Sequence, residues 1–404
     1  MSEKGASIFS GKGGILGRMV DTSGARRILV LNYEYPPLGG GSSPVTQAVC
    51  QELVKQGNRV DVVTMAFRGL PALEERGGVR IVRVPCLRKA RHICHARELL
   101  TWVISAYVRA KRLVRSEGYD LIHSHFFFPS GVVARRLSRS RGVPYVVTSH
   151  GSDVPGYNPD RFRAMHRFLG PFWRSVVRDA AAITSPSQWL AELIEENYGK
   201  PLDIEIIPNG IDEHWVEEGR KERSVLFVSR LLRRKGAQFL LQALSDVPLG
   251  HEVHIVGEGP YRAELERAAK DLPNPVTFHG WLENDSAALA DLYRKSSIFA
   301  FPSLAENFPV SLLEAMVAGC AIVATDLDSC HEVLGDSARY FAPGDVQGLR
   351  RHLVELTENQ AAREQLAAAA RERIRGRFTW SRIGRRYQDL FESVAGSTAG
   401  APAS

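Results

Sequence analysis

The chain has 404 residues, more than one hydrophobic core usually supports, so we expect two domains of ordinary size. Its composition, 44% hydrophobic and 24% charged, is typical of a soluble globular protein, and five cysteines without a C-x-x-C pair argue against a disulfide framework or a zinc site. No apolar stretch is long enough to span a bilayer and the amino terminus lacks a signal-peptide core, which predicts a cytoplasmic protein, while the net charge of +7 permits an acidic partner.

Strand-like and helical patterns alternate from residue 28 onward. Residues 1–26 show no periodicity and are expected to form a flexible tail. The first series of predicted strands occupies residues 28–31, 60–64, 79–84, 121–123 and 145–148, with a helix at about 41–57 and a final segment at 204–212. A polar linker at residues 213–223 follows.

A second series of predicted strands occupies residues 225–228, 253–256, 276–278, 298–301 and 321–324. Strands that alternate with helices form parallel, doubly wound sheets. The sequence therefore predicts an α/β protein in which two Rossmann-like domains face each other across a cleft. The composition then favours helices up to residue 394, and residues 395–404 are expected to be a disordered tail.

Two glutamates, Glu306 and Glu314, lie on either side of a predicted strand-to-helix turn. Pro309 suits the first turn of the helix and Gly319 its end. The amides at such a helix start usually face phosphate, because they have no partner within the helix. One carboxylate is then placed to meet the far end of the ligand and the other a pair of hydroxyls, which suits a nucleotide sugar. Alternatively, both glutamates are solvated charges beside the helix start.

A basic loop follows the predicted strand at residues 225–228. Cations there stabilise the charge that develops on a departing phosphate more than they stabilise the ground state. Arg230 and Lys235 are the candidates, whereas Arg233 and Arg234 are interpreted as surface charges. On charge pattern alone, a solvated basic turn is the preferred interpretation of the loop.

Two further loops end predicted strands of the first series. Gly39, Gly40 and Gly41 let backbone amides approach a phosphate or an acceptor, although a glycine triplet after two prolines is often only a turn. His150 follows the strand at residues 145–148 and is expected to face the cleft, although a lone histidine there is often structural.

Two patterns bear on metal binding. His123 and His125 lie two residues apart, but no third ligand is evident, so packing is the preferred interpretation. Asp326 and Asp328 form a D-x-D pattern of a kind that can bind manganese, but two residues make a poor motif and we interpret them as loop acids. No metal or other cofactor is expected.

Residues 88–115 carry eight Lys or Arg and the single acid Glu98, interleaved with Trp102 and Tyr107. A basic amphipathic helix of this kind can rest on an anionic membrane surface. The alternative is a core-facing helix with a solvated basic face. We therefore expect a protein that is cytoplasmic and peripheral on the inner face of the membrane.

Seven motifs resemble a known family when taken in order. They are YPPLGGG at 35–41, TSHGSD at 148–153, IPNGID at 207–212, VSRLLRRKG at 228–236, VGEGP at 256–260, HG at 279–280 and the glutamate pair. Together they resemble the retaining glycosyltransferases of family four, which have the GT-B fold. The resemblance covers about residues 27–394 and implies an acceptor-side domain at 27–207, a linker at 208–223, a nucleotide-sugar domain at 224–378 and a helix at 379–394 that packs back on the first domain.

The resemblance also implies roles for individual residues. Arg230 and Lys235 would hold the donor diphosphate, His150 would contact the donor sugar, and Glu306 would meet the sugar hydroxyls. The backbone of Asn307, Phe308 and Pro309 would form the amide-rich turn beneath sugar and phosphate. Glu314 would accept hydrogen bonds from both ribose hydroxyls. The glycine loop at 39–41 would border donor and acceptor.

The reaction implied is metal-independent transfer of a hexose, with retention, from a UDP- or GDP-sugar to a glycan, a lipid-linked acceptor or an envelope polysaccharide. One departure is that many relatives carry Gly-Gly where this chain has Asp328 and Ser329. Alternatives are a nucleotide-sugar epimerase of the same architecture and a non-catalytic basic binding protein. No nucleic-acid module is recognised, and GEGPYR at 257–262 lacks the third glycine of a dinucleotide fingerprint.

Overall fold

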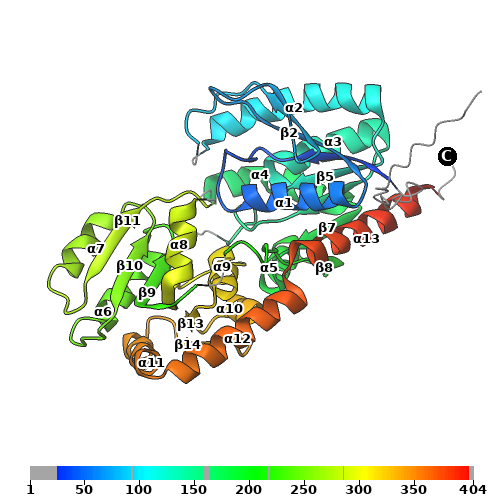
Figure 1. Cartoon of the computed structure of the whole chain (residues 1–404). Helices are drawn as coiled ribbons and strands as arrows, with labels where there is room; N and C mark the ends of the chain where they lie inside the picture. The colour runs from blue at the N-terminus through cyan, green and yellow to red at the C-terminus, as the bar shows by residue number, and fades with distance from the viewer. Residues whose placement is uncertain (1–24, 92–93, 158–162, 217–218, 285, 400–404) are drawn as a thin grey trace, which may run out of the picture.

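The computed structural model describes residues 25–91, 94–157, 163–216, 219–284 and 286–399. Most of the predicted amino-terminal tail, 1–26, and residues 400–404 of the predicted carboxyl-terminal tail lie outside the described residues. The described chain forms two α/β domains, each built around its own sheet (Figure 1). This arrangement confirms the predicted fold class.

The first domain contains an eight-stranded sheet within the described residues. In spatial order its strands are β3 (Leu73–Arg76), β4 (Val79–Val84), β2 (Arg59–Met65), β1 (Arg27–Leu31), β5 (Leu121–His125), β6 (Tyr145–Thr148), β7 (Ala182–Ser185) and β8 (Ile204–Ile206). The neighbours pair in parallel except for β3, which is antiparallel to β4. The prediction of a purely parallel sheet is wrong at this edge, because the LEER sequence of β3 gives no apolar signal.

Helices cover both faces of this sheet. They are α1 (Ser42–Lys55), α2 (Ala96–Glu117), η2 (Phe127–Gly131), α3 (Val132–Arg141), α4 (Arg163–Asp179) and α5 (Gln188–Tyr198). The side chains of β1 alternate between the faces: Leu29 and Leu31 pack with α2, α3, α4 and α5, whereas Ile28 and Val30 pack with α1. This two-sided burial explains the continuous apolar runs found in the sequence.

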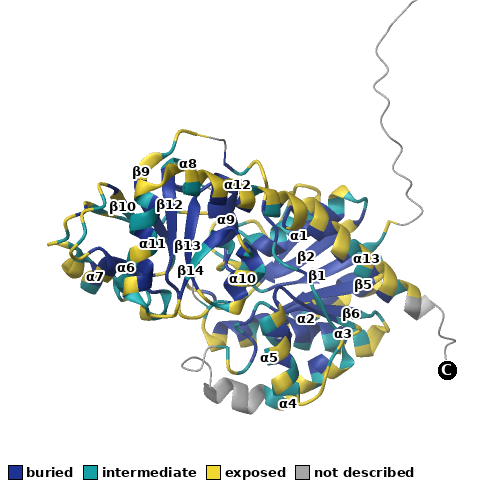
Figure 2. Ribbon diagram, turned by 90° about the horizontal axis from the view of Figure 1, so that it is seen from below, coloured by how far each residue is buried: buried dark blue, intermediate teal, exposed yellow. Residues whose placement is uncertain are grey.

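The second domain contains a six-stranded parallel sheet within the described residues. Its strands, in spatial order, are β11 (Val276–Gly280), β10 (Glu252–Val256), β9 (Glu222–Val228), β12 (Ser296–Phe301), β13 (Ala321–Thr325) and β14 (Ala338–Phe341). The helices are η3 (Arg233–Lys235), α6 (Ala237–Ala243), α7 (Arg262–Ala269), α8 (Ala287–Lys295), α9 (Val310–Ala318), α10 (Asp328–Leu334), α11 (Val346–Glu358) and α12 (Gln360–Arg377). Leu226 and Phe299 pack toward α8, α9, α10 and α12, and Val225 and Phe227 toward α6, α7 and α11, so this sheet is also buried on both faces (Figure 2).

The last helix, α13 (Trp380–Ala399), returns to the first domain as predicted (Figure 1). Tyr387 and Phe391 complete the core beneath α1, and Asn58 Nδ2 donates to Gln388 Oε1 at 2.7 Å. The helix extends to Ala399, beyond its predicted end at residue 394. The chain thus crosses between the domains twice, and the crossings pair, because Ile211 N donates to the carbonyl of Phe378 at 2.7 Å.

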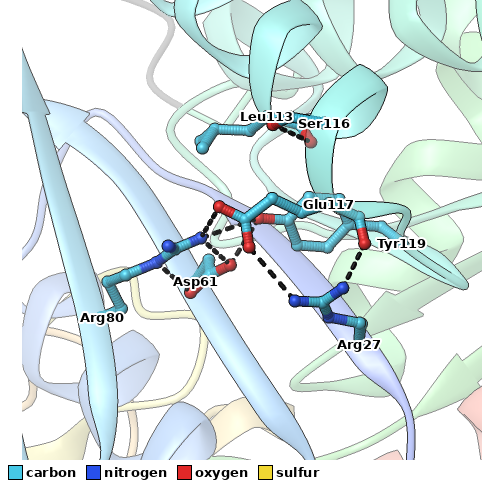
Figure 3. Close-up of polar contacts among 7 residues, drawn as sticks. All are labelled: Arg27, Asp61, Arg80, Leu113, Ser116, Glu117 and Tyr119. Atoms are coloured by element: carbon cyan, nitrogen blue, oxygen red, sulfur yellow. Dashed lines mark hydrogen bonds and ion pairs between the residues drawn. The ribbon is translucent and has the colours of Figure 1, made fainter.

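A network of ion pairs lies at the amino ends of β1, β2 and β4 (Figure 3). Arg80 binds both carboxylate oxygens of Asp61, at 2.7 and 2.6 Å, and also reaches Glu117 at 2.9 Å. Arg27 reaches Glu117 at 3.1 Å, and the Tyr119 hydroxyl donates to Asp61. We call these five residues the amino-end network. It ties the end of α2 to the sheet, on the side away from the other domain.

Candidate functional site

The loop that carries Arg230 packs tightly against the loop after β10. Leu231 N donates to the carbonyl of Glu258 at 2.9 Å. A Cβ added to Gly257 would lie 1.9 Å from the carbonyl oxygen of Ser229, so only glycine permits this approach. The glycines of the VGEGP motif therefore position Arg230, whose side chain is exposed at the carboxyl end of β9.

Lys235 and Glu306 form an ion pair between two loops of the second domain. Lys235 Nζ lies 2.5 Å from Glu306 Oε1, and the two side chains are only 13% and 9% exposed. The loops touch along the backbone as well, because a Cβ on Gly236 would lie 1.8 Å from the carbonyl oxygen of Pro302. The predicted cation and the predicted sugar-binding carboxylate are thus brought together after β9 and β12.

The charges of this loop region in the second domain shift the pKa of Tyr157 in the first domain. Its pKa is raised to about 12 by burial first and by Glu306 next, while Arg234 and Arg230 oppose the shift. The side chains of both domains therefore share one electrostatic environment. Arg234 is half-buried, which corrects its interpretation as a surface charge. Arg233 is a surface charge as predicted, since it is exposed and pairs with Glu264 at 3.0 Å.

His150 is held by a stack of histidines at the carboxyl ends of β5 and β6. Its Nε2 lies 2.9 Å from His125 Nδ1, and the two rings are nearly parallel, with centroids 5.2 Å apart. The ring of His123 follows, 4.3 Å from that of His125. Burial lowers the pKa of His150 and of His123 to about 3, so these rings are neutral near pH 7.

Hydroxyl groups hold the other two histidines of the stack. Thr46 Oγ1 lies 3.2 Å from His125 Nδ1, and Thr148 Oγ1 lies 2.8 Å from His123 Nε2. These contacts support a packing and positioning role for His123 and His125. No group of three potential metal-binding side chains occurs among the described residues.

Asn307 joins the two domains. Its Oδ1 accepts a hydrogen bond of 2.5 Å from Ser187 Oγ, and its Nδ2 donates to the carbonyl of His150 at 3.5 Å. Asn209 Nδ2 in turn donates to the carbonyl of Phe308 at 3.5 Å. Pro309 is the N-cap of α9, one residue before the helix rather than inside its first turn. The turn at 307–309 therefore lies directly beside His150.

Glu314 lies on the second turn of α9 and is half-buried. Tyr293 Oη donates to its Oε2 at 2.7 Å. Burial raises the pKa of Glu314 to about 7, although this hydrogen bond opposes the shift. The carboxyl group can thus change its ionisation near neutral pH when a hydrogen-bond donor arrives.

The glycine loop contains one glycine that its conformation requires. Gly39 has φ +108°, and a Cβ there would collide with the side chain of Glu34. Gly40 and Gly41 are exposed, and a Cβ on either would meet no atom within 4 Å. Gly40 N donates to Glu34 Oε2 at 3.2 Å. The loop thus leaves space after β1, with Glu34 beside it.

Asp328 and Ser329, which stand where many relatives carry Gly-Gly, are the first two residues of α10. Asp326 Oδ1 lies 2.6 Å from His331 Nε2, so Asp326 already has a partner other than a metal ion. Glu332 accepts hydrogen bonds from the amides of Gln188 at 2.9 Å and Trp189 at 3.3 Å, across the domain boundary. Helix α10 therefore holds the start of α5 against the second domain.

Comparison with known proteins decides the family. The description Glycosyltransferase Family 4 matches residues 39–215, and Glycosyl transferases group 1 matches residues 222–359. The chain is 30% identical over 357 residues to the 2-deoxystreptamine glucosyltransferase of Streptomyces kanamyceticus, covering 78% of this chain and 91% of that protein. The chain belongs to glycosyltransferase family 4. The resemblance found in the sequence is confirmed.

Other relatives of this glycosyltransferase agree. It is 28% identical over 385 residues to the phosphatidyl-myo-inositol mannosyltransferase of Mycolicibacterium smegmatis, covering 91% of this chain and 94% of that protein. Among solved structures, Anabaena HepE in complex with UDP and glucose superposes with a TM-score of 0.73 at 20% identity, covering 91% of this chain and all of that one. That similarity confirms the GT-B fold.

The sequence located the loops of this glycosyltransferase but missed several residues that support them. The missed residues include Tyr293, which binds Glu314, and Tyr157, whose pKa Glu306 raises; neither belongs to a sequence motif. His125 was noticed, but its contact with His150 joins the ends of two strands and has no signal in the order of the residues. The predicted strand ends indicated which side chains lie close together, whereas the contacts that fix those side chains depend on tertiary packing.

Proposed function

We propose that this glycosyltransferase moves a hexose, with retention of anomeric configuration, from a UDP- or GDP-sugar to a hydroxyl of a glycan or lipid-linked acceptor of the cell envelope. The observation that carries the proposal is the pair of Lys235 and Glu306, 2.5 Å apart and largely shielded, directly before the turn at 307–309. Arg230 follows the neighbouring strand β9, and its charge acts on Tyr157 together with that of Glu306. A cation, an exposed guanidinium and a helix start converge there, which suits a diphosphate.

Arg230 and Lys235 take the role of stabilising the departing diphosphate. In the free protein the carboxylate of Glu306 neutralises Lys235. An incoming diphosphate offers Lys235 a second anionic partner, so Glu306 is then able to turn toward the sugar hydroxyls. Because both cations are positioned by packed loops, little reorganisation is needed when negative charge develops. These residues supply positive charge from the protein, and we propose that no metal ion is required.

The transfer step breaks the bond between the anomeric carbon and the diphosphate oxygen. The acceptor oxygen forms its bond to that carbon on the face that the diphosphate leaves. The proton of the acceptor hydroxyl passes to an oxygen of the departing phosphate. This route keeps the configuration without a protein nucleophile. His150, neutral and held by His125, contributes hydrogen bonding to the donor sugar rather than a charge.

The other donor contacts follow from the same geometry. The half-buried carboxyl group of Glu314 accepts hydrogen bonds from the two ribose hydroxyls. The amides of 307–309 lie beneath the sugar and phosphate, and the loop at 39–41 leaves room for donor and acceptor. HepE binds UDP and glucose, and the M. smegmatis relative is a phosphatidyl-myo-inositol mannosyltransferase, which together support a nucleoside-diphosphate donor and a lipid-linked acceptor.

Helix α2 supports docking on an anionic membrane. Leu100, Ile104 and Val108 are 56%, 68% and 45% exposed and lie four residues apart, so they form one apolar stripe on the solvent side. Exposed basic residues flank the stripe: Arg97, Arg109, Lys111, Arg112 and Arg115. No described helix is long and apolar enough to cross a membrane. A basic helix with an apolar stripe binds in the plane of an anionic surface.

Two residues of the predicted basic segment have another role. Trp102 is fully buried in the core of the first domain. The Arg88 guanidinium is also buried, where it donates to the carbonyls of Ala90 and Arg91 at 2.9 and 2.7 Å. We therefore confine the proposed membrane contact to the exposed face of α2.

Flotation with vesicles tests the membrane contact. The wild type is expected to bind vesicles containing phosphatidylglycerol at low salt, and Ile104→Glu to lose that binding. Leu73→Glu, which alters an exposed leucine of β3, is the matched control and keeps it. Equal binding by wild type and Ile104→Glu would contradict the assignment of this face.

Product analysis tests the reaction. Thermal shift with UDP and GDP identifies the nucleotide, and incubation of the matching nucleotide sugars with an acceptor extract, in the presence of EDTA, follows transfer. Proton NMR then reports the anomeric configuration of the product. Inversion of configuration, or epimerised nucleotide sugar without transfer, would overturn the proposal.

A further inference from the structure

A second pocket lies at the crossing between the domains. Its volume is about 700 Å³, within the range of small-molecule sites. Pro186, Ile206 and Pro208 contribute from the first domain, and Phe308 and Phe378 from the other side. The pocket thus has apolar walls from both domains.

Five arginines line this pocket: Arg373, Arg377, Arg382, Arg385 and Arg386. The last three lie at spacings of three and four residues on α13, so they share one face of the helix. We call these five residues the arginine pocket. So many guanidinium groups around one hollow repel each other unless an anion is present.

Few carboxylates compensate the arginine pocket. Arg386 pairs with Glu205 at 3.3 Å, but no ion pair involves Arg377, Arg382 or Arg385 within the described part of the chain. Two carboxylates also line the pocket, those of Glu332 and Asp389. Glu332 is bound by the α5 amides, so the five arginines still outnumber the acids.

Arg373 has only neutral partners. It donates to the carbonyls of Val333 and Glu332 at 2.7 and 2.9 Å. Burial lowers the pKa of Arg373, and the charge of Arg377 lowers it further. The positive charge of the pocket is therefore largely unbalanced.

We propose that the arginine pocket binds a small organic phosphate, such as a sugar phosphate, and that its occupancy is coupled to donor binding. Guanidinium groups bind phosphate oxygens in pairs, and the flanking phenyl and proline rings suit the carbon skeleton of the ligand. An open hollow of about 700 Å³ between domains can hold a small molecule and leaves it an entry path from solvent. This site is separate from Arg230 and Lys235, which belong to the proposed donor site.

The coupling follows from where the pocket lies. The ring of Phe308 packs on Phe378 with centroids 5.8 Å apart, while the backbone of Phe308 belongs to the turn beside His150. The two chain crossings pair at the same place, through Ile211 and Phe378. A ligand that contacts both domains here favours one arrangement of them, and such coupling is reciprocal. This part of the inference rests on the proposed function.

Isothermal titration of the full chain with fructose 1,6-bisphosphate, without nucleotide, tests the site. Arg382→Ala/Arg385→Ala is expected to weaken binding by about tenfold or more. Arg351→Ala/Arg375→Ala removes the same charge from exposed arginines outside the pocket and is expected to leave the affinity unchanged. Arg230→Ala/Lys235→Ala is also expected to bind the probe normally.

The outcomes separate the two sites. Loss of binding only in Arg230→Ala/Lys235→Ala would place the phosphate in the donor site and overturn this inference, while leaving the proposed function intact. Equal losses in all three double variants would show attraction by net charge only and would also overturn it. A saturating concentration of the probe is further expected to change the affinity of the wild type for UDP or GDP by about fivefold. No change would refute the coupling.

Discussion

The two ends of the first sheet carry polar clusters of opposite character. At the amino end, the amino-end network joins Asp61, Arg80 and Glu117 through ion pairs of 2.6 to 3.1 Å. At the carboxyl end, His123, His125 and His150 form a buried stack without charge. The first cluster is made of fixed charges that satisfy one another, and the second of neutral groups.

The second cluster is also incompletely satisfied. His123 Nδ1 and His125 Nε2 are buried and have no hydrogen-bond partner among the described residues. Native proteins rarely leave buried polar atoms in this state, and groups with strongly shifted pKa values gather at functional sites. The comparison teaches that the polar residues at the amino end satisfy one another and stabilise the fold, whereas the histidines at the carboxyl end hold His150 beside the turn at 307–309.

Removing a charge from the amino-end network should affect stability most. Asp61→Ala leaves Arg80 without its bidentate partner and removes the acceptor of Tyr119, but Arg80 keeps Glu117, so we expect a loss of about 2–3 kcal/mol in the free energy of unfolding. Chemical denaturation measures it. Glu264→Ala, which breaks the exposed pair with Arg233, is the control and should cost less than about 1 kcal/mol. If folded Asp61→Ala bound the donor nucleotide more weakly than the wild type does, the amino-end network would also affect the site, which would contradict the comparison.

Lys235→Ala should affect catalysis most. Loss of a preorganised cation at the proposed site of the departing diphosphate is expected to lower kcat by about 100- to 1000-fold. Some stability should be lost as well, because the variant leaves Glu306, whose side chain is only 9% exposed, without its cation. Initial rates and thermal unfolding, measured on the same preparation, decide the matter. Arg233→Ala should keep normal turnover.

The pH dependence of nucleotide binding should report on Glu314. Its pKa of about 7 means that the free protein holds this carboxyl group protonated below neutral pH, whereas ribose hydroxyls bind the ionised form. Lowering the pH from about 8 to about 6 should therefore weaken the binding of UDP or GDP by about tenfold. Titration calorimetry of Glu314→Gln should show weaker binding and no such dependence. If the pH dependence of nucleotide binding persisted in Glu314→Gln, a titratable group other than Glu314 would be responsible for it.

The raised pKa of Glu314 also makes the stability of the free protein depend on pH. Because the folded state binds a proton at Glu314 more tightly than the unfolded state does, the free protein should lose stability as the pH rises from the ordinary carboxyl pKa toward about 7. Bound nucleotide should reduce this loss. Denaturation midpoints with and without UDP or GDP measure it, using Glu314→Gln as the control.

The smallest effect is expected at His125, which positions His150. His125→Phe keeps a stacked ring but removes the nitrogen that contacts His150 Nε2, so we expect a fall of about fivefold in kcat. His125→Asn keeps a polar atom near the Nδ1 position and should recover most of the rate. Equal rates for both variants would leave His125 with a packing role only.

The sequence predicted the strands that position the site, because each is a short apolar run buried on both faces, as in β1 and β12. It therefore also placed Arg230, Lys235 and Glu306 at strand ends. It missed β3, whose charged sequence lies at an exposed edge, and it took Arg88 for a surface charge although its guanidinium is buried.

The contacts that complete the site could not be predicted in the same way. Tyr293 reaches Glu314, and Asn307 reaches Ser187, only because separate elements pack against each other. Their spacing in the sequence carries no period that a strand or helix would impose. The sequence thus predicts which edge of the sheet carries the chemistry, while the tertiary packing decides the partners.

The most direct test compares the binding of a nucleoside diphosphate with that of its monophosphate. Titration calorimetry should show that the wild type and Arg233→Ala prefer the diphosphate by about tenfold or more, because in the proposed donor site Arg230 and Lys235 bind the second phosphate. Arg230→Ala/Lys235→Ala should bind both nucleotides with similar, weak affinity. An undiminished preference in that double variant would contradict the assignment of these cations to the donor diphosphate.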